Sequence, residues 1–205
     1  MNDIYSSHEL NYKPRWLASL LREAVKDHSI TVLTGARQVG KSTLLRQEEP
    51  FSKWHYISLD DFDALAQAKR APFSLWAGKE QIIIDEVQKS PSLLNAIKMA
   101  TDSHPNKYRF VLSGSANLLL MKKISESLAG RAVYFILNPL TIGEMHNNPP
   151  PNLLTDFFQG NFSITKDLKQ RFISPWELMW KGFMPSLLRL SDTASILRWW
   201  EGYVS

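Results

Sequence analysis

Apolar side chains along the chain follow two spacings, one typical of helices and one typical of buried strands. Residues 12–27 read YKPRWLASLLREAVKD, and their larger apolar side chains recur every three or four positions. This spacing predicts an amphipathic helix with Pro14 in its first turn. Further along come short apolar runs: SITVLTG, KWHYISLDD, EQIIIDE, YRFVLSGSA and RAVYFILNPL. Continuous apolar runs of this length are typical of strands that are covered on both faces.

Helical segments are predicted between these runs. One starts at Lys41, and another, FDALAQAKR, follows Asp61, whose side chain suits a helix N-cap. A third is predicted to start at Ser90-Pro91, because proline fits the first helical position. NLLLMKKISESLAG, residues 117–130, supplies a fourth. Strands that alternate with helices predict an α/β fold with a parallel sheet and helices on both faces.

The pattern changes after residue 140. TIGE (141–144) and SPWE (174–177) both have the Ser/Thr-x-x-Glu spacing of a capping box, which predicts a helix start at each. HNNPPPN lies between them and is a turn-rich linker. Helices are also predicted around residues 153–159 and 165–173 and in the C-terminal stretch DTASILRWWEGYVS.

This organisation predicts two parts. Residues 1–146 form one domain, and residues 147–205 form a linker followed by an incomplete, mainly helical domain. The tryptophans of the second part pack either on one another or on a surface outside it, and left exposed they would promote association. They are Trp176, Trp180, Trp199 and Trp200.

Composition and charge restrict the class of protein. Of the 205 residues, 44% are hydrophobic and 21% are charged, which suits a globular protein with a sizeable core. The chain has no cysteine, no signal-peptide pattern at its N-terminus and no apolar run near the roughly 20 residues that span a bilayer. We therefore expect a cytoplasmic protein with no membrane partner. A net charge of +4 permits a nucleic-acid partner but is more typical of a slightly basic cytosolic protein.

The most specific motif is GARQVGKS, residues 35–42, which lies between a predicted strand and a predicted helix. It matches the phosphate-binding pattern G-x-x-x-x-G-K-[ST], in which glycines let several backbone N–H groups point at one phosphate. Lys41 supplies positive charge for the β- and γ-phosphates, and the Ser42 hydroxyl is a ligand for Mg²⁺. The predicted nucleotide-binding residues are Gly35, Ala36, Arg37, Gln38, Val39, Gly40, Lys41, Ser42 and Thr43.

A second motif, IIIDE, suits hydrolysis of the nucleotide. Hydrolysis needs a carboxylate that holds the metal and a group that orients or activates water. Asp85 ends a predicted buried strand and is expected to join Ser42 around Mg²⁺. Glu86 is expected to polarise the attacking water. A small-molecule kinase commonly lacks such a glutamate, so the Asp-Glu pair favours hydrolysis of the nucleotide.

Polar residues near two further strands are candidates as well. The strand that follows the Asp-Glu pair ends in LSGSAN, where Ser113 is predicted to contact the γ-phosphate or the water. Ser115 and Asn117 are alternatives, and Ser115 fits a helix cap equally well. Arg131, in SLAGR, either reaches the nucleotide of a neighbouring subunit or forms an ordinary surface salt bridge.

Taken in order, the motifs resemble a prokaryotic family of AAA+ superfamily ATPases. The matching segments are GARQVGKSTLL, ISLDD, IIIDEVQKSPSLLNAIK, FVLSGSANLLL and ESLAGRAVYFILNPLTIGE, and the resemblance covers about residues 12–145. It implies the three-layer P-loop NTPase sandwich with a parallel five-stranded sheet of order 5-1-4-3-2. It also implies ATP with Mg²⁺ and a sensor residue on the strand of LSGSA. Members continue into a larger C-terminal domain, and WKGFMPSLLRL is similar to its beginning.

The leading hypothesis is a Mg²⁺-dependent ATPase that acts as a switch or motor on a protein or nucleic-acid partner and that could form a homo-oligomer. ATP is expected rather than GTP, because no guanine-reading N-K-x-D motif is evident. One alternative is a regulatory module that binds ATP with little or no turnover. Another is a small-molecule P-loop phosphotransferase, which the Asp85-Glu86 pair disfavours.

Overall fold

The protein forms two compact units, Met1–Asn138 and Pro139–Ser205. The structure is a computed structural model and describes residues 12–115, 128, 130–160 and 174–204. The domain boundary after residue 146 stays a prediction.

A parallel sheet forms the centre of the first unit. Its strands are β1 (Ile30–Gly35), β2 (His55–Ser58), β3 (Gln81–Asp85), β4 (Arg109–Ser115) and β5 (Ala132–Ile136). Their order is β2-β3-β4-β1-β5, which confirms the order implied by the resemblance, counted from the other edge. Neighbouring strands all run parallel, and Ile30 at the start of β1 lies opposite both Phe110 and Ala132. The carboxyl ends of the strands therefore share one edge of the sheet, beside the loop that follows β1.

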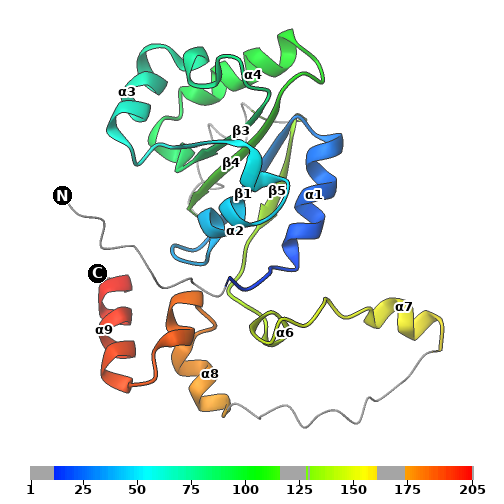
Figure 1. Cartoon of the computed structure of the whole chain (residues 1–205), viewed down its shortest axis with the longest axis vertical. Coiled ribbons are helices and arrows are strands. Elements are labelled where there is room, and N and C mark those ends of the chain that lie inside the picture. Colours follow the sequence, from blue (N-terminus) through cyan, green and yellow to red (C-terminus); the bar gives the residue numbers. More distant parts are fainter. Residues whose placement is uncertain (1–11, 116–127, 129, 161–173, 205) are drawn as a thin grey trace. The chain divides into compact units, whose positions relative to one another are not determined.

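Helices cover both faces of this sheet, which gives the predicted three layers (Figure 1). The helices are α1 (Leu17–Asp27), α2 (Lys41–Gln47), α3 (Phe62–Arg70) and α4 (Leu93–Ser103). Leu44 of α2 shares a core with Ile83 and with buried residues of α1. Ile97 of α4 shares a second core with Ile84 and with α3. Since successive residues of a strand point to opposite faces, β3 contributes to both cores, and this explains its uninterrupted apolar sequence.

Of two helix starts predicted from local sequence, one is confirmed and one is wrong. The Asp61 side chain accepts a hydrogen bond from the Ala64 backbone N–H at 2.8 Å, which confirms the predicted N-cap. The predicted start at Ser90-Pro91 is wrong, because α4 begins at Leu93. Ser90 and Pro91 instead form a turn in which Leu93 N–H donates to the Ser90 carbonyl at 3.0 Å. The helix predicted for residues 117–130 lies largely outside the described residues.

The second unit is helical where it is described. Its helices are α6 (Ile142–Met145), α7 (Leu153–Phe158), α8 (Pro175–Lys181) and α9 (Thr193–Val204). The capping box of α6 is confirmed, because Glu144 N–H donates to Thr141 Oγ1 at 3.1 Å and Thr141 N–H donates to Glu144 Oε2 at 2.8 Å. The helix predicted around residues 165–173 lies outside the described residues.

The capping box predicted at the start of α8 is wrong. Ser174 occupies the N-cap position, but its side chain accepts no capping hydrogen bond. The Glu177 carboxylate instead accepts a hydrogen bond from Lys181 at 3.0 Å, one helical turn further on. The spacing of the sequence allows both arrangements, and the ion pair at i,i+4 replaces the box.

The tryptophans of this unit divide into packed and exposed side chains. Trp199 and Trp200 pack edge to face at 4.8 Å beside a small core formed by Met184, Leu187 and Ile196. The Trp200 indole N–H donates to the Trp180 carbonyl at 2.8 Å, whereas Trp176 is 71% exposed. None of the helices in the described residues is long and apolar enough to cross a bilayer.

Candidate nucleotide-binding site

The loop between β1 and α2 has the backbone conformation that its glycines were predicted to provide. Gly35 has φ +153° and Gly40 has φ +100°, and Gln38 between them has φ +58°. A Cβ atom on Gly35 would lie 2.3 Å from the Leu137 carbonyl oxygen, because the chain leaving β5 passes directly against the loop. Only glycine fits at this point. The loop is therefore fixed on one side by β5 and continues directly into α2.

Lys41 is held inside this loop. Its side chain is buried, and its ammonium group donates hydrogen bonds to the carbonyls of Gly35 at 3.0 Å and Ala36 at 2.8 Å. Burial lowers the pKa of Lys41, and the nearby carboxylates of Glu86 and Asp85 partly oppose that shift. The positive charge thus lies within the concave loop, close to the carboxylates that end β3.

Arg15 supports the loop from the N-terminal side, a role that was not predicted. The side chain is buried, with Nη1 donating to the Val39 carbonyl at 3.0 Å and Nη2 donating to the Asn138 carbonyl at 2.5 Å. It connects the segment before α1 with the phosphate-binding loop and with the chain leaving β5. These partners are distant in sequence, so no local spacing could have indicated the contact.

Asp85 joins the end of β3 to the loop. It is 3% exposed, and its Oδ2 atom accepts a hydrogen bond from Ser42 Oγ at 2.5 Å. The same oxygen accepts a hydrogen bond from the Tyr56 hydroxyl, and Oδ1 accepts one from the Glu86 backbone N–H at 3.0 Å. The structure thus brings together the two residues predicted to hold Mg²⁺.

Tyr56 is a site residue that sequence reasoning missed. It lies on β2, and the guanidinium of Arg46, from α2, lies 4.3 Å from its ring centre. Burial, followed by the hydrogen bond to Asp85, raises the pKa of Tyr56 to about 12. The hydroxyl therefore stays protonated at neutral pH and donates to Asp85. A tyrosine in a half-buried strand is so common that its identity alone gave no signal.

Replacing Tyr56 with phenylalanine removes this hydroxyl and keeps the ring under Arg46. Loss of a group that orients a metal ligand typically costs about 10- to 100-fold in metal affinity or activity. We therefore expect the Mg²⁺ concentration for half-maximal ATPase activity to rise within that range, with a smaller effect at saturating Mg²⁺. The matched control is Tyr134→Phe, because the Tyr134 hydroxyl is buried without a hydrogen-bond partner among the described residues. An equal change in both variants would contradict a specific role for Tyr56.

Glu86 lies where the chain turns out of the sheet. Its backbone is left-handed, with φ +56° and ψ +39°, an uncommon conformation for a residue other than glycine and one that often marks functional sites. Its Oε2 atom accepts a hydrogen bond from the Gln88 side-chain amide. The turn places the Glu86 carboxylate beside Asp85, and Gln88 holds its orientation.

Ser113 lies beside these carboxylates on the neighbouring strand. Ile84 of β3 is opposite Leu112 of β4, so the next residues along, Asp85 and Ser113, are neighbours. Ser113 is fully buried, and its hydroxyl has no hydrogen-bond partner within the part of the chain that the structure describes. An unpaired buried hydroxyl is unusual and is consistent with the predicted polar contact. Of the two alternatives, Ser115 is the last residue of β4 and Asn117 lies outside the described residues.

Arg131 does not join this group within one chain. Its guanidinium forms a two-point ion pair with Asp102, with distances of 2.7 Å from Nε to Oδ1 and 3.1 Å from Nη2 to Oδ2. It comes just before β5, at the edge of the sheet opposite the phosphate-binding loop. The salt-bridge alternative is therefore present in the structure, and a role toward a neighbouring subunit stays a prediction.

Comparisons with known proteins point in the same direction. A family described as an AAA domain matches residues 27–146. Two relatives are 32% identical over 140 residues: the uncharacterized protein Rv2008c of Mycobacterium tuberculosis and the uncharacterized protein Mb2031c of Mycobacterium bovis. Each match covers 66% of this chain and 31% of the relative, so the chain spans about a third of the length of the curated relatives it matches.

A solved structure supports the fold independently. The Walker-type ATPase PABY2304 of Pyrococcus abyssi is similar to this chain with a TM-score of 0.57 and 18% sequence identity. The similarity covers 96% of this chain and 73% of that one. At this level of identity the likeness concerns the arrangement of the elements.

Proposed function

Because this chain belongs to the AAA-domain family of P-loop ATPases, we propose that it binds ATP with Mg²⁺ and hydrolyses the terminal phosphoanhydride bond. The observation that carries the proposal is the hydrogen bond from Ser42 to Asp85, 2.5 Å long. It places the hydroxyl at the start of α2 and the carboxylate at the end of β3 around one point, beside the Lys41 ammonium.

The residues at this point fit Mg²⁺. The ion prefers hard oxygen ligands and usually takes only one or two carboxylates, with water and phosphate oxygens completing the shell. Ser42 Oγ and Asp85 Oδ2 are such oxygens, and hydrogen bonds from Ser42, Tyr56 and the Glu86 backbone N–H hold the Asp85 carboxylate in position. When bound, Mg²⁺ would neutralise charge on the β- and γ-phosphates.

The other residues have distinct parts in the proposed reaction. Backbone N–H groups of the loop and the start of α2 bind the phosphates, and Lys41 exchanges its hydrogen bonds to the loop carbonyls for contacts with phosphate oxygens. Glu86 accepts a proton from the water that attacks the γ-phosphorus, and Gln88 orients its carboxylate. Ser113 offers its unpaired hydroxyl to that water or to the γ-phosphate.

The direct test measures phosphate release from ATP with Mg²⁺ and with the metal chelated. Turnover is expected only with Mg²⁺. Lys41→Ala should bind ATP more weakly, because truncating one partner of a buried charge pair costs about 2–5 kcal/mol. This cost corresponds to a loss of affinity of about 30-fold to several thousand-fold. Thermal stabilisation by Mg·ATP measures binding separately, because a ligand stabilises only the state that binds it. A folded Lys41→Ala protein with unchanged affinity and turnover would refute the assignment.

A second candidate is an ATP-binding module with little turnover. It is favoured by the interactions that Lys41 and Glu86 already make, since the first donates to the loop and the second accepts from Gln88. If these interactions persist when ATP binds, neither group is free to act on it. Thermal stabilisation by Mg·ATP without measurable phosphate release would select this function over hydrolysis.

The partner is proposed to be a macromolecule, either another copy of this chain or a protein or nucleic acid. An ATPase of this type converts hydrolysis into a change of shape, and a conformational change has use only when something is bound to the moving part. A second copy could also bring Arg131 of one subunit toward the nucleotide of the next.

A further inference from the structure

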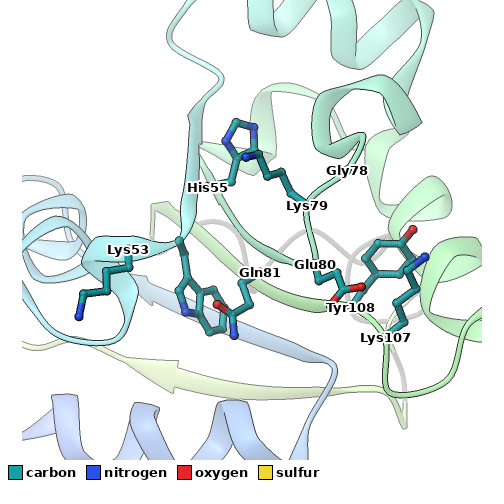
Figure 2. Close-up of a pocket in the computed structure, with 9 residues that line it drawn as sticks. Lys53, His55, Gly78, Lys79, Glu80, Gln81, Lys107 and Tyr108 are labelled. Atoms are coloured by element: carbon teal, nitrogen blue, oxygen red, sulfur yellow. The ribbon is translucent and has the colours of Figure 1, made fainter.

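A cavity of about 750 Å³ opens at the edge of the sheet opposite the phosphate-binding loop (Figure 2). It is formed where β2, β3 and β4 begin, by side chains from three connections that are far apart in sequence. Ligands of open α/β sheets usually bind at the carboxyl ends of the strands. This cavity lies at the amino ends, so the proposed ATP site does not account for it.

The charge of the cavity is mainly positive. Lys53, Lys79 and Lys107 line it, and Glu80 is the only acidic residue among the side chains that do so. In Figure 2, Lys53 and Lys107 lie on opposite sides of the view, with Lys79 between them. Lys53 pairs with Glu49 at 3.1 Å, but both side chains are exposed, and an exposed pair of this kind is weak enough to exchange for another anion. Lysines spread over three connections suit an extended anion better than a single compact one.

Aromatic and hydrogen-bonding groups lie between these lysines. His55 and Tyr108 are partly exposed rings in the lining, and the Lys107 ammonium lies 5.4 Å from the centre of the Tyr108 ring. The wall also contains Trp54, whose buried indole N–H has no hydrogen-bond partner in the described residues. Gln81 and Glu80 offer amide and carboxylate groups, which pair with the amino groups of bases.

We propose that this cavity binds single-stranded nucleic acid. A nucleic-acid strand offers both of the features that the lining matches, a phosphate for each lysine and a flat base for each accessible ring. An acidic peptide matches the lysines by its charge but offers no regular series of flat bases for the rings. Double-stranded nucleic acid keeps its bases stacked inside the helix, so the rings could not reach their faces.

The position of the cavity gives such binding a route to the proposed ATP site. Gln81 at the first end of β3 lines the cavity, and Asp85 at the other end accepts the hydrogen bond from Ser42. On β2, His55 lines the cavity, and the next residue, Tyr56, donates to Asp85. Binding itself does not depend on hydrolysis, so it is tested without nucleotide, and its failure leaves the proposed ATPase function untouched.

The test is fluorescence anisotropy of a short labelled oligothymidylate and its RNA equivalent, titrated with the full chain over a range of salt concentrations. For single strands the logarithm of affinity falls with the logarithm of salt by about 0.7 for each phosphate neutralised. We therefore expect a contribution of about 2 to that slope from the three lysines, Lys53, Lys79 and Lys107. Replacing all three with alanine should lower the slope by this amount. Tyr108→Ala should weaken binding by about 5- to 150-fold through lost stacking and leave the salt slope nearly unchanged.

The matched control replaces Lys26, Lys69 and Lys98 with alanine, which removes the same charge from lysines that do not line the cavity. It should retain the slope, and both triple-lysine variants should keep the thermal stability and the ATPase rate of the parent protein. The proposal is overturned if the control loses affinity as much as the cavity variant, or if the cavity variant binds like the parent. It is also overturned if duplex DNA or polyglutamate binds as tightly with the same lysine dependence, or if free AMP displaces the strand at similar concentration.

Discussion

Replacing Glu86 with glutamine is expected to lower ATP turnover by about 10²–10⁴-fold, the usual contribution of a general base, and to leave ATP binding intact. The amide has the size of the carboxylate and still accepts the hydrogen bond from Gln88, so its orientation should survive. What it loses is the capacity to take a proton from water. Phosphate release measures the loss, and thermal stabilisation by Mg·ATP shows whether binding persists.

Two control variants distinguish the role of Glu86 from the roles of other carboxylates. Glu80→Gln makes the same chemical change at the opposite end of β3 and should keep the parent rate, because Glu80 lies away from the phosphate-binding loop. Asp85→Asn should instead weaken Mg²⁺ dependence and binding of Mg·ATP, because Asp85 is the proposed metal ligand. Hydrolysis at the parent rate by Glu86→Gln, or normal Mg·ATP binding by Asp85→Asn, would show that the roles are misassigned.

The layers of the fold could be predicted because the sheet is buried on both faces. That burial makes strands such as Ile82–Ile84 continuously apolar, and polar or glycine residues then mark their ends. The order of the strands could not be predicted in this way. No local pattern states which strands are neighbours, so the order followed only from the resemblance to a family and was then confirmed.

Some residues of the candidate site could likewise be predicted from the sequence, and others could not. Lys41, Ser42, Asp85 and Glu86 were predictable because each belongs to a short motif in which chemistry and position are linked. Tyr56 and Arg15 were not, because their contacts join elements that only the folded sheet brings together. The cavity at the amino ends of the strands could not be predicted for the same reason, since its lysines come from three separate connections.

Local signals were wrong where two local interactions competed. The Ser174 capping box and the Glu177–Lys181 ion pair both satisfy the spacing in SPWELMWK, and the ion pair forms. Both interactions are small, about 0.2–0.5 kcal/mol for an i,i+4 pair and about 1 kcal/mol for a cap, and each varies with its surroundings. Spacing alone does not resolve energies of that size.

Arg131→Ala is expected to reduce ATP turnover by about 10³–10⁵-fold and to keep ATP binding, if the residue acts as an arginine finger toward a neighbouring subunit. Within one chain, Arg131 lies too far from the phosphate-binding loop to reach ATP bound there. β5 begins opposite Ile30, and the phosphate-binding loop follows Gly35, so the length of β1, about 17 Å, separates Arg131 from that loop. The ion pair with Asp102 is exposed on both sides and is therefore weak enough to be given up.

The experiment compares Arg131→Ala with Asp102→Ala, which breaks the same ion pair and leaves the arginine in place. A finger supplied by a neighbour predicts that only Arg131→Ala loses turnover and that the rate per chain of the parent protein rises with protein concentration. It also predicts that mixing Arg131→Ala with Lys41→Ala restores activity, because the second variant donates its arginine to the ATP bound by the first. Equal behaviour of the Arg131 and Asp102 variants, a rate independent of concentration and no recovery in the mixture would leave Arg131 with its ion pair as its whole role.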